Sequence, residues 1–466
     1  MCRVVPEAAS VRFAKGAYYK ISELCFWVSR TPNSAMMKVL ALLLLAAVAL
    51  AKHEELIGWK SYYLAPANEE HLKTIGRLKY DLDLDVLSHP ILQREGVVLV
   101  KPEHHDSFIQ AVQEAGIPYR VHRDDVKAAL DYDDMVIETR RRERVMRNSR
   151  EMPYDSYQRM DVIDAYLERI AREYPDIVTL VTAANSFNGR PINYLKISTT
   201  NFEDESKPVI FIDGGIHARE WISPPTVTYA IRKLVEDVTE SDLLDRFDWI
   251  LLPVVNPDGY EHTFTTYRFW RKTRSTDQHS LSPTCPGVDG NRNYDFFWNT
   301  VGTSASPCAD TYAGNRPFSE IETRVVRDIV QENLHRLALY LTMHSYGSMI
   351  LYPWGHDGTL SPNAFALHLV GVAMADRIFE NQLPNFPRYV VGNSVLVIGY
   401  PAAGASEDWA HLVGVPLSYT YELPGLAGGL NGFHLDPIYI EQVAKETWEG
   451  IVVGARQAGD LFLRNK

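Results

Sequence analysis

The feature that most constrains the fold is a series of short apolar segments that alternate with amphipathic ones from about residue 151 onward. Four segments have the length and composition of buried strands, namely residues 209–212, 249–252, 337–343 and 417–423. Apolar side chains at helical spacing predict amphipathic helices around residues 162–170 and 227–235. The alternation predicts an α/β domain with a largely parallel sheet covered on both faces, whose ligands gather at the carboxyl ends of its strands.

The preceding stretch, from residue 52 to about residue 130, has a different pattern. It contains a helical segment at 71–78, a strand-like segment at 96–100, a second helix near Phe108 and a strand at 119–121. This pattern predicts a small α+β unit. A chain of 466 residues is long enough for two or three such folding units.

An arginine-rich segment at 138–150 separates the two patterns. It carries Arg140, Arg141, Arg142, Arg144, Arg147 and Arg150. Such a run is often only the solvated face of a helix. Between two folded units it is also an accessible target for a trypsin-like protease, and we interpret it as an activation site.

Charge and cysteine content exclude two classes of protein. The formal net charge is −12 and no basic face is evident, which argues against a nucleic-acid-binding protein. None of the four cysteines forms a C-x-x-C pair, so a metal site would be built from histidines and carboxylates.

An apolar run at 39–51 follows Lys38 and ends in small residues, which is typical of a signal peptide. We therefore predict a signal peptide at 37–51 and a secreted, extracellular protein. Residues 1–36 are an extension of doubtful status: either translation begins at Met36 or Met37, or the run is a signal anchor behind a short cytoplasmic tail.

The secreted product would keep only Cys285 and Cys308. In an oxidising compartment this pair is expected to form one disulfide bond. The bond would close a loop of 23 residues and contribute roughly 3 kcal/mol to stability.

His217 and Glu220 directly follow the strand at 209–212. Alone, a histidine and a glutamate three residues apart occur by chance, although they would share a face if the turn were helical. Their position strengthens the signal, because His344 closes the strand at 337–343. Two histidines and one glutamate, with a fourth position open to water, form a catalytic zinc set.

Two further sets of residues could complete a hydrolytic site. Glu422 ends the alternating strand at 417–423 and could serve as a base, unless it is simply an exposed strand end. Arg271 and the Asn291-Arg292 pair would each be ordinary surface residues alone, but together they suit carboxylate recognition and oxyanion stabilisation.

From about residue 52 to the C-terminus the chain resembles the pancreatic-type zinc carboxypeptidases of the A/B subfamily, which are synthesised as procarboxypeptidases. The resemblance implies one Zn²⁺ per chain and assigns the following site residues. The zinc ligands would be His217, Glu220 and His344, with Asp289 as the partner of His217. Glu422 would be the general base and Arg271 would stabilise the oxyanion. Asn291, Arg292 and Tyr400 would bind the terminal carboxylate of the substrate, Arg219 would lie in an outer subsite, and Cys285 would pair with Cys308.

The resemblance also implies a domain organisation. Residues 52–144 would be an inhibitory propeptide with an arginine-rich activation linker, and residues 151–466 the catalytic domain with a mixed, mostly parallel sheet. The propeptide would contain a small antiparallel sheet. Substrates would be peptides and proteins with a free C-terminus, the activator a trypsin-like protease, and the active form a monomer.

Glu407 bears on specificity. It matches a position that is apolar in A-type members and Asp in B-type members, so a carboxylate there favours C-terminal Lys or Arg. Glu is one methylene longer than Asp, however, and Val395 and Gly355 resemble A-type lining, so an apolar or aromatic preference is the alternative.

Two other functions compete with peptide hydrolysis. A non-catalytic peptide-binding homologue would be expected to lack a zinc ligand or the base, and this chain has all four residues. A zinc deacylase on a related scaffold would need neither the prosegment nor the whole set of Asn291, Arg292 and Tyr400.

Overall fold

The computed structural model describes residues 52–88, 90, 92, 95–147, 151–384, 386–425 and 432–464, and also 10–13 and 17–20. The predicted signal peptide at 37–51 and most of the 1–36 extension lie outside the described residues. Two compact units divide the chain at residues 54 and 55. In the first, β1 (Ser10–Phe13) pairs antiparallel with β2 (Ala17–Lys20). In the described part of the chain, no helix is long and apolar enough to cross a membrane.

The second unit begins with a four-stranded antiparallel sheet in the order β4-β5-β3-β6. Its strands are β3 (Lys60–Leu64), β4 (Asp85–Ser88), β5 (Gly96–Val100) and β6 (Tyr119–Arg123), and its helices are α3 (Glu69–Asp81) and α4 (His105–Glu114). Strand alternation divides its faces: Tyr62 and Val98 pack on the helices, whereas Tyr63 and Leu99 pack toward Phe269. The small α+β unit is therefore present as predicted.

The arginine-rich segment continues a long helix, α5 (Val126–Arg147). Arg141 lies 3.2 Å from Asp161, and Arg140 donates to the carbonyl of Asp155. Among the described residues, Arg142 pairs along the helix, with Glu138 at 3.0 Å. Arg140 and Arg141 thus contact the following domain, while the partner of Arg142 is a neighbour one turn away in α5.

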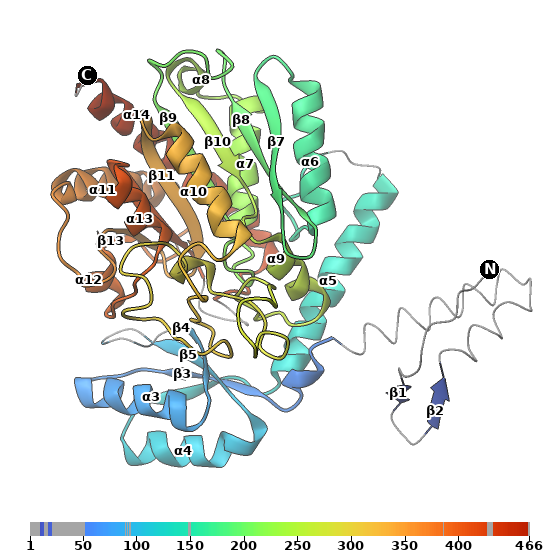
Figure 1. Cartoon of the computed structure of the whole chain (residues 1–466). Coiled ribbons are helices and arrows are strands. Elements are labelled where there is room, and N and C mark those ends of the chain that lie inside the picture. Colours follow the sequence, from blue (N-terminus) through green and yellow to red (C-terminus); the bar gives the residue numbers. More distant parts are fainter. Residues whose placement is uncertain are drawn as a thin grey trace, which may run out of the picture. The chain divides into compact units, whose positions relative to one another are not determined.

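The main sheet has eight strands in the order β13-β12-β14-β11-β9-β10-β8-β7 (Figure 1). They are β7 (Val178–Asn185), β8 (Pro191–Ile197), β9 (Val209–Gly214), β10 (Asp248–Leu252), β11 (Leu337–Ser345), β12 (Met349–Tyr352), β13 (Val390–Asn393) and β14 (Leu417–Leu423). The four central strands, β10, β9, β11 and β14, are mutually parallel, and β12 pairs parallel with β13. The remaining pairs are antiparallel, so the sheet is mixed, as predicted.

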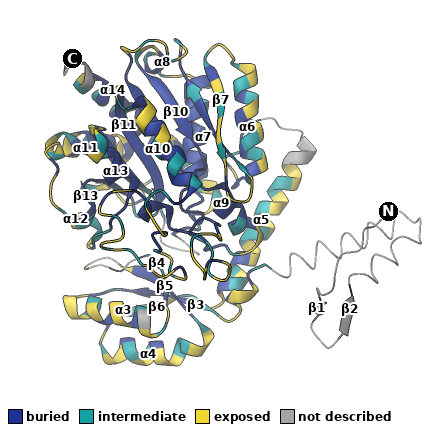
Figure 2. Cartoon of the chain, viewed as in Figure 1, coloured by how far each residue is buried: buried dark blue, intermediate teal, exposed yellow. Residues whose placement is uncertain are grey.

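Helices cover both faces of this sheet. One face packs α6 (Met160–Glu173), α7 (Ser223–Val235), α11 (Ala364–Asn381) and α14 (Ile440–Arg464), and the other packs α10 (Ile321–Asn333) and α13 (Ser406–Val413). Shorter helices are α8 (Asp242–Arg246), α9 (Pro257–Thr265) and α12 (Ser394–Ile398). Within β9, Ile210 and Ile212 face one cluster while Val209 and Phe211 face the other. The central strands are consequently buried on both sides (Figure 2).

Cys285 and Cys308 form the expected disulfide bond, with an S–S distance of 2.02 Å. The bond closes a 23-residue loop that is otherwise largely irregular. It therefore restricts a segment that contains one short 3-10 helix, Gly290–Arg292, and no strand ladder.

Replacing both cysteines by serine should lower the free energy of unfolding by roughly 3 kcal/mol, because the unfolded chain regains its loop entropy. Urea denaturation of the two proteins measures the difference. A reductant should bring the natural chain down to the stability of the variant and leave the variant unchanged. Equal stabilities under oxidising conditions would contradict the prediction.

Candidate functional site

Three neighbouring parallel strands deliver the predicted site residues to one edge of the sheet. The register of β11 pairs Met343 with Gly214 of β9 and His344 with Glu422 of β14. His217 lies in the loop that leaves β9. Because parallel strands end at the same edge, side chains separated by up to about 200 residues meet there.

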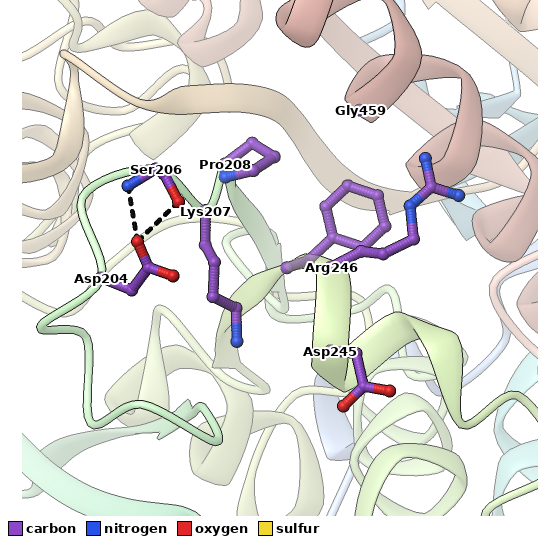
Figure 3. A pocket seen from close by; sticks show the side chains of 8 residues that line it. Asp204, Ser206, Lys207, Pro208, Asp245, Arg246 and Gly459 are labelled. Atoms are coloured by element: carbon purple, nitrogen blue, oxygen red, sulfur yellow. Dashed lines mark hydrogen bonds between the residues drawn. The ribbon is translucent and has the colours of Figure 1, made fainter.

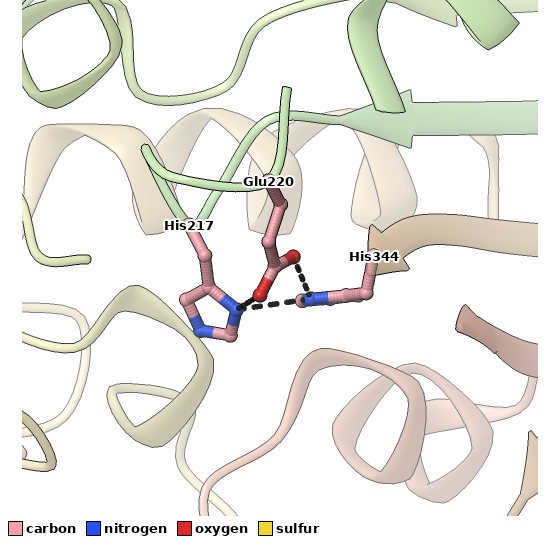
Figure 4. A group of neighbouring side chains, drawn as sticks. All are labelled: His217, Glu220 and His344. Carbon is pink, nitrogen blue, oxygen red and sulfur yellow. Dashed lines mark hydrogen bonds and ion pairs between the residues drawn. The ribbon is translucent and has the colours of Figure 1, made fainter. Parts of the chain in front are cut away.

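His217, Glu220 and His344 are buried, and each offers a ligand atom within 4.8 Å of the others (Figure 4). His217 Nδ1 lies 2.8 Å from Glu220 Oε1, and His344 Nδ1 lies 3.0 Å from Glu220 Oε2. The two Nδ1 atoms are 3.0 Å apart. His217 and Glu220 sit on a tight turn rather than a helix, since the Glu220 N–H donates to the His217 carbonyl and α7 begins only at Ser223.

The outer nitrogen of His217 is also engaged: Nε2 lies 3.0 Å from Asp289 Oδ1. A carboxylate at Nε2 keeps the proton there and leaves Nδ1 free to bind a metal. Burial alone would raise the pKa of Glu220, but His217 and His344 hold it well below its ordinary value. Two imidazole nitrogens and one carboxylate, which converge from the turn after β9 and from the end of β11, are a donor set that fits Zn²⁺.

Glu422 stands beside this group at the end of β14. Burial and the neighbouring Glu220 carboxylate raise the pKa of Glu422 to about 7. A carboxyl group with a pKa near neutrality is suited to exchange a proton during a reaction. Arg271 lies on the same side: its Nε donates to Asp289 Oδ2 at 3.0 Å, and its Nη1 is 3.9 Å from Glu220 Oε1.

Asn291 and Arg292 follow Asp289 in a short turn, where the Asn291 N–H donates to Asp289 Oδ1. The Asn291 side-chain oxygen accepts from the Ser406 N–H at 2.8 Å, which ties this turn to α13. Arg292 Nη1 donates to the Asn291 carbonyl. Burial raises the pKa of Tyr400, and the nearby Arg292 and Arg271 cations oppose that shift.

Glu407 lies in the first turn of α13 and is buried. Its Oε2 has no hydrogen-bond partner among the described residues, and burial raises the pKa of its carboxyl group. The adjacent Asp408 differs, because it accepts two contacts from the Gly355 N–H at 2.9 and 2.8 Å. Both carboxylate oxygens of Asp408 thus accept hydrogen bonds from the backbone, whereas Oε2 of Glu407 accepts none among the described residues.

Arg219 connects the site to the small α+β unit. Its Nη1 lies 3.3 Å from Asp310, donates to the Phe269 carbonyl, and lies 3.7 Å from Asp85 Oδ1, at the start of β4. The guanidinium is stacked over the Phe433 ring at 4.6 Å. The predicted outer-subsite residue is therefore in contact with the predicted propeptide.

One supporting residue, Arg268, has no role assigned from the sequence. Arg268 is only 1% exposed and lies over the Trp221 ring at 3.5 Å. It donates to the Arg219 carbonyl at 2.8 Å and to the Phe433 carbonyl at 2.6 Å. It thus supports the turn that carries His217 and Glu220. Its position between two aromatic residues, Tyr267 and Phe269, was a weak signal of burial.

A separate hollow of about 220 Å³ lies where β9 and β10 begin, at the opposite end of these strands (Figure 3). Lys207 lines it, but its amino group donates to the Leu244 carbonyl at 2.8 Å and to Thr199. Arg246 is paired with Asp460 at 2.7 Å. Both cations are used by the fold, so this hollow offers no competing site.

Comparisons with known proteins agree with this geometry. Residues 163–450 match the family described as zinc carboxypeptidase, and residues 62–133 match the carboxypeptidase activation peptide. The chain is 66% identical over 427 residues to carboxypeptidase B of Helicoverpa zea, with 91% of this chain and 100% of the relative covered. It is 35% identical over 430 residues to carboxypeptidase B of Rattus norvegicus, with 88% and 96% covered.

Among solved structures, carboxypeptidase A from Helicoverpa armigera superposes with a TM-score of 0.82 at 43% identity. The superposition covers 88% of this chain and 99% of that one. The fold, the converging donor set and these matches lead to one conclusion: the chain belongs to the zinc carboxypeptidase family and carries that family's activation peptide.

Proposed function

We propose that this protein is the zymogen of a secreted carboxypeptidase that hydrolyses the C-terminal peptide bond of peptides and proteins, with Glu422 as general base. The observation that carries the proposal is the convergence of His217, Glu220 and His344 beside Glu422, whose pKa is raised to about 7. The alternative is a peptide-binding protein without activity. A missing zinc ligand or a missing base would support it, and this chain has all four residues.

Bound through His217, Glu220 and His344, zinc would lower the pKa of a bound water and polarise the substrate carbonyl. The residues of the chain supply the rest. Glu422 accepts the proton of the attacking water and passes it to the leaving amine. Arg271, held by Asp289, donates to the oxygen that becomes negative.

Arg292, Asn291 and Tyr400 would bind the free carboxylate of the substrate. Only a chain terminus presents a carboxylate at the correct distance from the metal, so an internal peptide bond would leave Arg292 unpaired in a buried site. This requirement accounts for exopeptidase activity.

The central test treats the purified proform with trypsin and assays peptides that end in Arg, Lys, Phe or Leu. We expect activity that a zinc chelator removes and added zinc restores. Glu422→Gln should lower kcat by about 10²–10⁴-fold while zinc content stays at one per chain, because the proton acceptor alone is lost. No activity on any peptide despite correct cleavage would contradict the proposed function.

We further propose that residues 37–51 are the signal peptide and that residues 52–144 inhibit the catalytic domain, 151–466, until a trypsin-like protease cuts the linker. The contact between Asp85 and Arg219 supports inhibition, because it occupies an arginine that an extended peptide would otherwise contact. Asp133 of α5 adds a second contact, at 3.0 Å from His434.

Asp85→Asn should raise the activity of the uncut zymogen on peptides of four or more residues, because Arg219 loses its ion pair with the small α+β unit and keeps only its contacts within the following domain. Rates before and after trypsin treatment measure the effect as a ratio. Asp83→Asn is the matched control: Asp83 is two residues away and pairs with Lys101 of the same small unit at 2.5 Å. Equal zymogen activities of the two variants would argue against a specific role of Asp85.

For specificity, we propose a B-like preference for C-terminal Lys and Arg. Glu407 supports it, because a buried carboxyl group with an unused oxygen is costly until a cation pairs with it. Several relatives are named carboxypeptidase B, including that of Helicoverpa zea. The alternative, an A-like preference for apolar or aromatic termini, would require Glu407 to stay unpaired in the complex.

Glu407→Gln should lower kcat/KM for peptides ending in Lys or Arg on the order of 10²–10³-fold, through loss of the charge partner. The kcat/KM for peptides ending in Leu should fall far less. Glu446→Gln is the control, because Glu446 is a second buried glutamate on α14 that accepts from Gln442 instead. Faster release of Phe or Leu than of Arg or Lys by the unaltered enzyme would overturn this assignment.

A further inference from the structure

The two histidines of the metal group are supported differently on their outer sides. His217 has a carboxylate directly at its outer nitrogen, Asp289 at 3.0 Å. His344 has a hydroxyl there instead: its Nε2 lies 3.3 Å from Thr342 Oγ1. The sequence gives no sign of this contact, because Thr342 lies between the apolar residues Leu341 and Met343 in a buried strand.

Strand geometry places this threonine between the histidine and a buried acid. Residues two apart share a face of a strand, so Tyr340, Thr342 and His344 form a polar row on β11. In the register with β9, Thr342 is paired with Asp213. Asp213 is 1% exposed, and its Oδ2 accepts from the Tyr340 hydroxyl at 2.7 Å.

The direction of each hydrogen bond follows from the metal. Because His344 Nδ1 faces His217 and Glu220, it would use its lone pair on a bound ion, and the ring proton would then reside on Nε2. The Nε2–H group would then donate to Thr342 Oγ1. The hydroxyl proton of Thr342 would remain available to donate to another acceptor. The neighbouring Asp213 Oδ1 is a buried oxygen that has no hydrogen-bond partner among the described residues.

The ionisation of Asp213 is consistent with a Thr342 hydroxyl proton that points toward its carboxylate. Burial raises its pKa to about 6, and the hydrogen bond from Tyr340 together with the neighbouring Thr342 hydroxyl opposes the rise. A hydroxyl that accepts from an imidazole and donates to a carboxylate transmits the polarity of that carboxylate to the ring.

We propose that Thr342 and Asp213 are positioning residues of the zinc centre, which hold His344 in its metal-binding tautomer and orientation through a hydroxyl-bridged carboxylate. The inference rests on the proposed zinc-binding role of His344. It explains why a threonine and an aspartate occupy the interior of two central strands, where apolar side chains would otherwise pack.

The test measures zinc binding rather than turnover. The trypsin-activated enzyme is equilibrated with a fluorescent zinc chelator, and both the zinc Kd and the rate of zinc loss are recorded. Thr342→Val keeps the shape and removes the bridge, so we expect its zinc Kd to rise about 10–100-fold. Thr342→Ser restores the hydroxyl and should bind within about threefold of the natural enzyme. Asp213→Asn, which keeps the shape but removes the charge, should also weaken zinc binding.

Thr226→Val is the matched control, since Thr226 is a buried threonine in α7 whose hydroxyl donates to the Ile222 carbonyl. It should leave the zinc Kd unchanged. Unchanged zinc affinity in both Thr342→Val and Asp213→Asn, or equal weakening in Thr226→Val, would overturn the inference. If the natural enzyme itself holds no zinc, the proposed function fails instead, so the two failures are distinguishable.

Discussion

The parallel register of β9, β11 and β14 is the constraint on which the rest of the molecule depends. Each of these strands is buried on both faces and ends at the same edge, and each delivers one part of the site there: a turn with two donors, one histidine, and one glutamate. A slip of one residue between β11 and either neighbour would turn His344 to the opposite face. The apolar clusters on the two faces therefore fix the metal geometry as well as stability.

Asp289 has a comparable role among the polar groups. It is fully buried and accepts from His217, from Arg271 and from the Asn291 N–H. Burial alone would raise its pKa, but Arg271 and His217 hold that pKa well below its ordinary value. One carboxylate therefore orients His217 of the metal group, the Arg271 proposed to stabilise the oxyanion, and the turn that begins the proposed carboxylate-binding group. Its desolvation is offset by these three partners.

Much of this arrangement could be predicted from the sequence, because strand ends are visible as the limits of apolar runs. His344 and Glu422 each close such a run, and parallel strands bring their ends together. What could not be predicted depends on contacts between distant segments. Arg268 carries a charge that is typical of a surface, and only the packing of Trp221 reveals its burial. Asp85 begins a strand of only four residues, β4, which is too short to show a periodic pattern.

Strand order also determines when the molecule can be completed during synthesis. β14 is the last strand made, yet it occupies a central place between β11 and β12. Until the ribosome has produced it, β11 and β12 each present an unpaired edge to the surroundings, which is the situation that favours aggregation. Glu422, the proposed general base, belongs to that same strand. A nascent chain that stops short of β14 is therefore left with an open sheet and without Glu422, so under the proposed mechanism such incomplete products would not act as proteases on the cell that makes them.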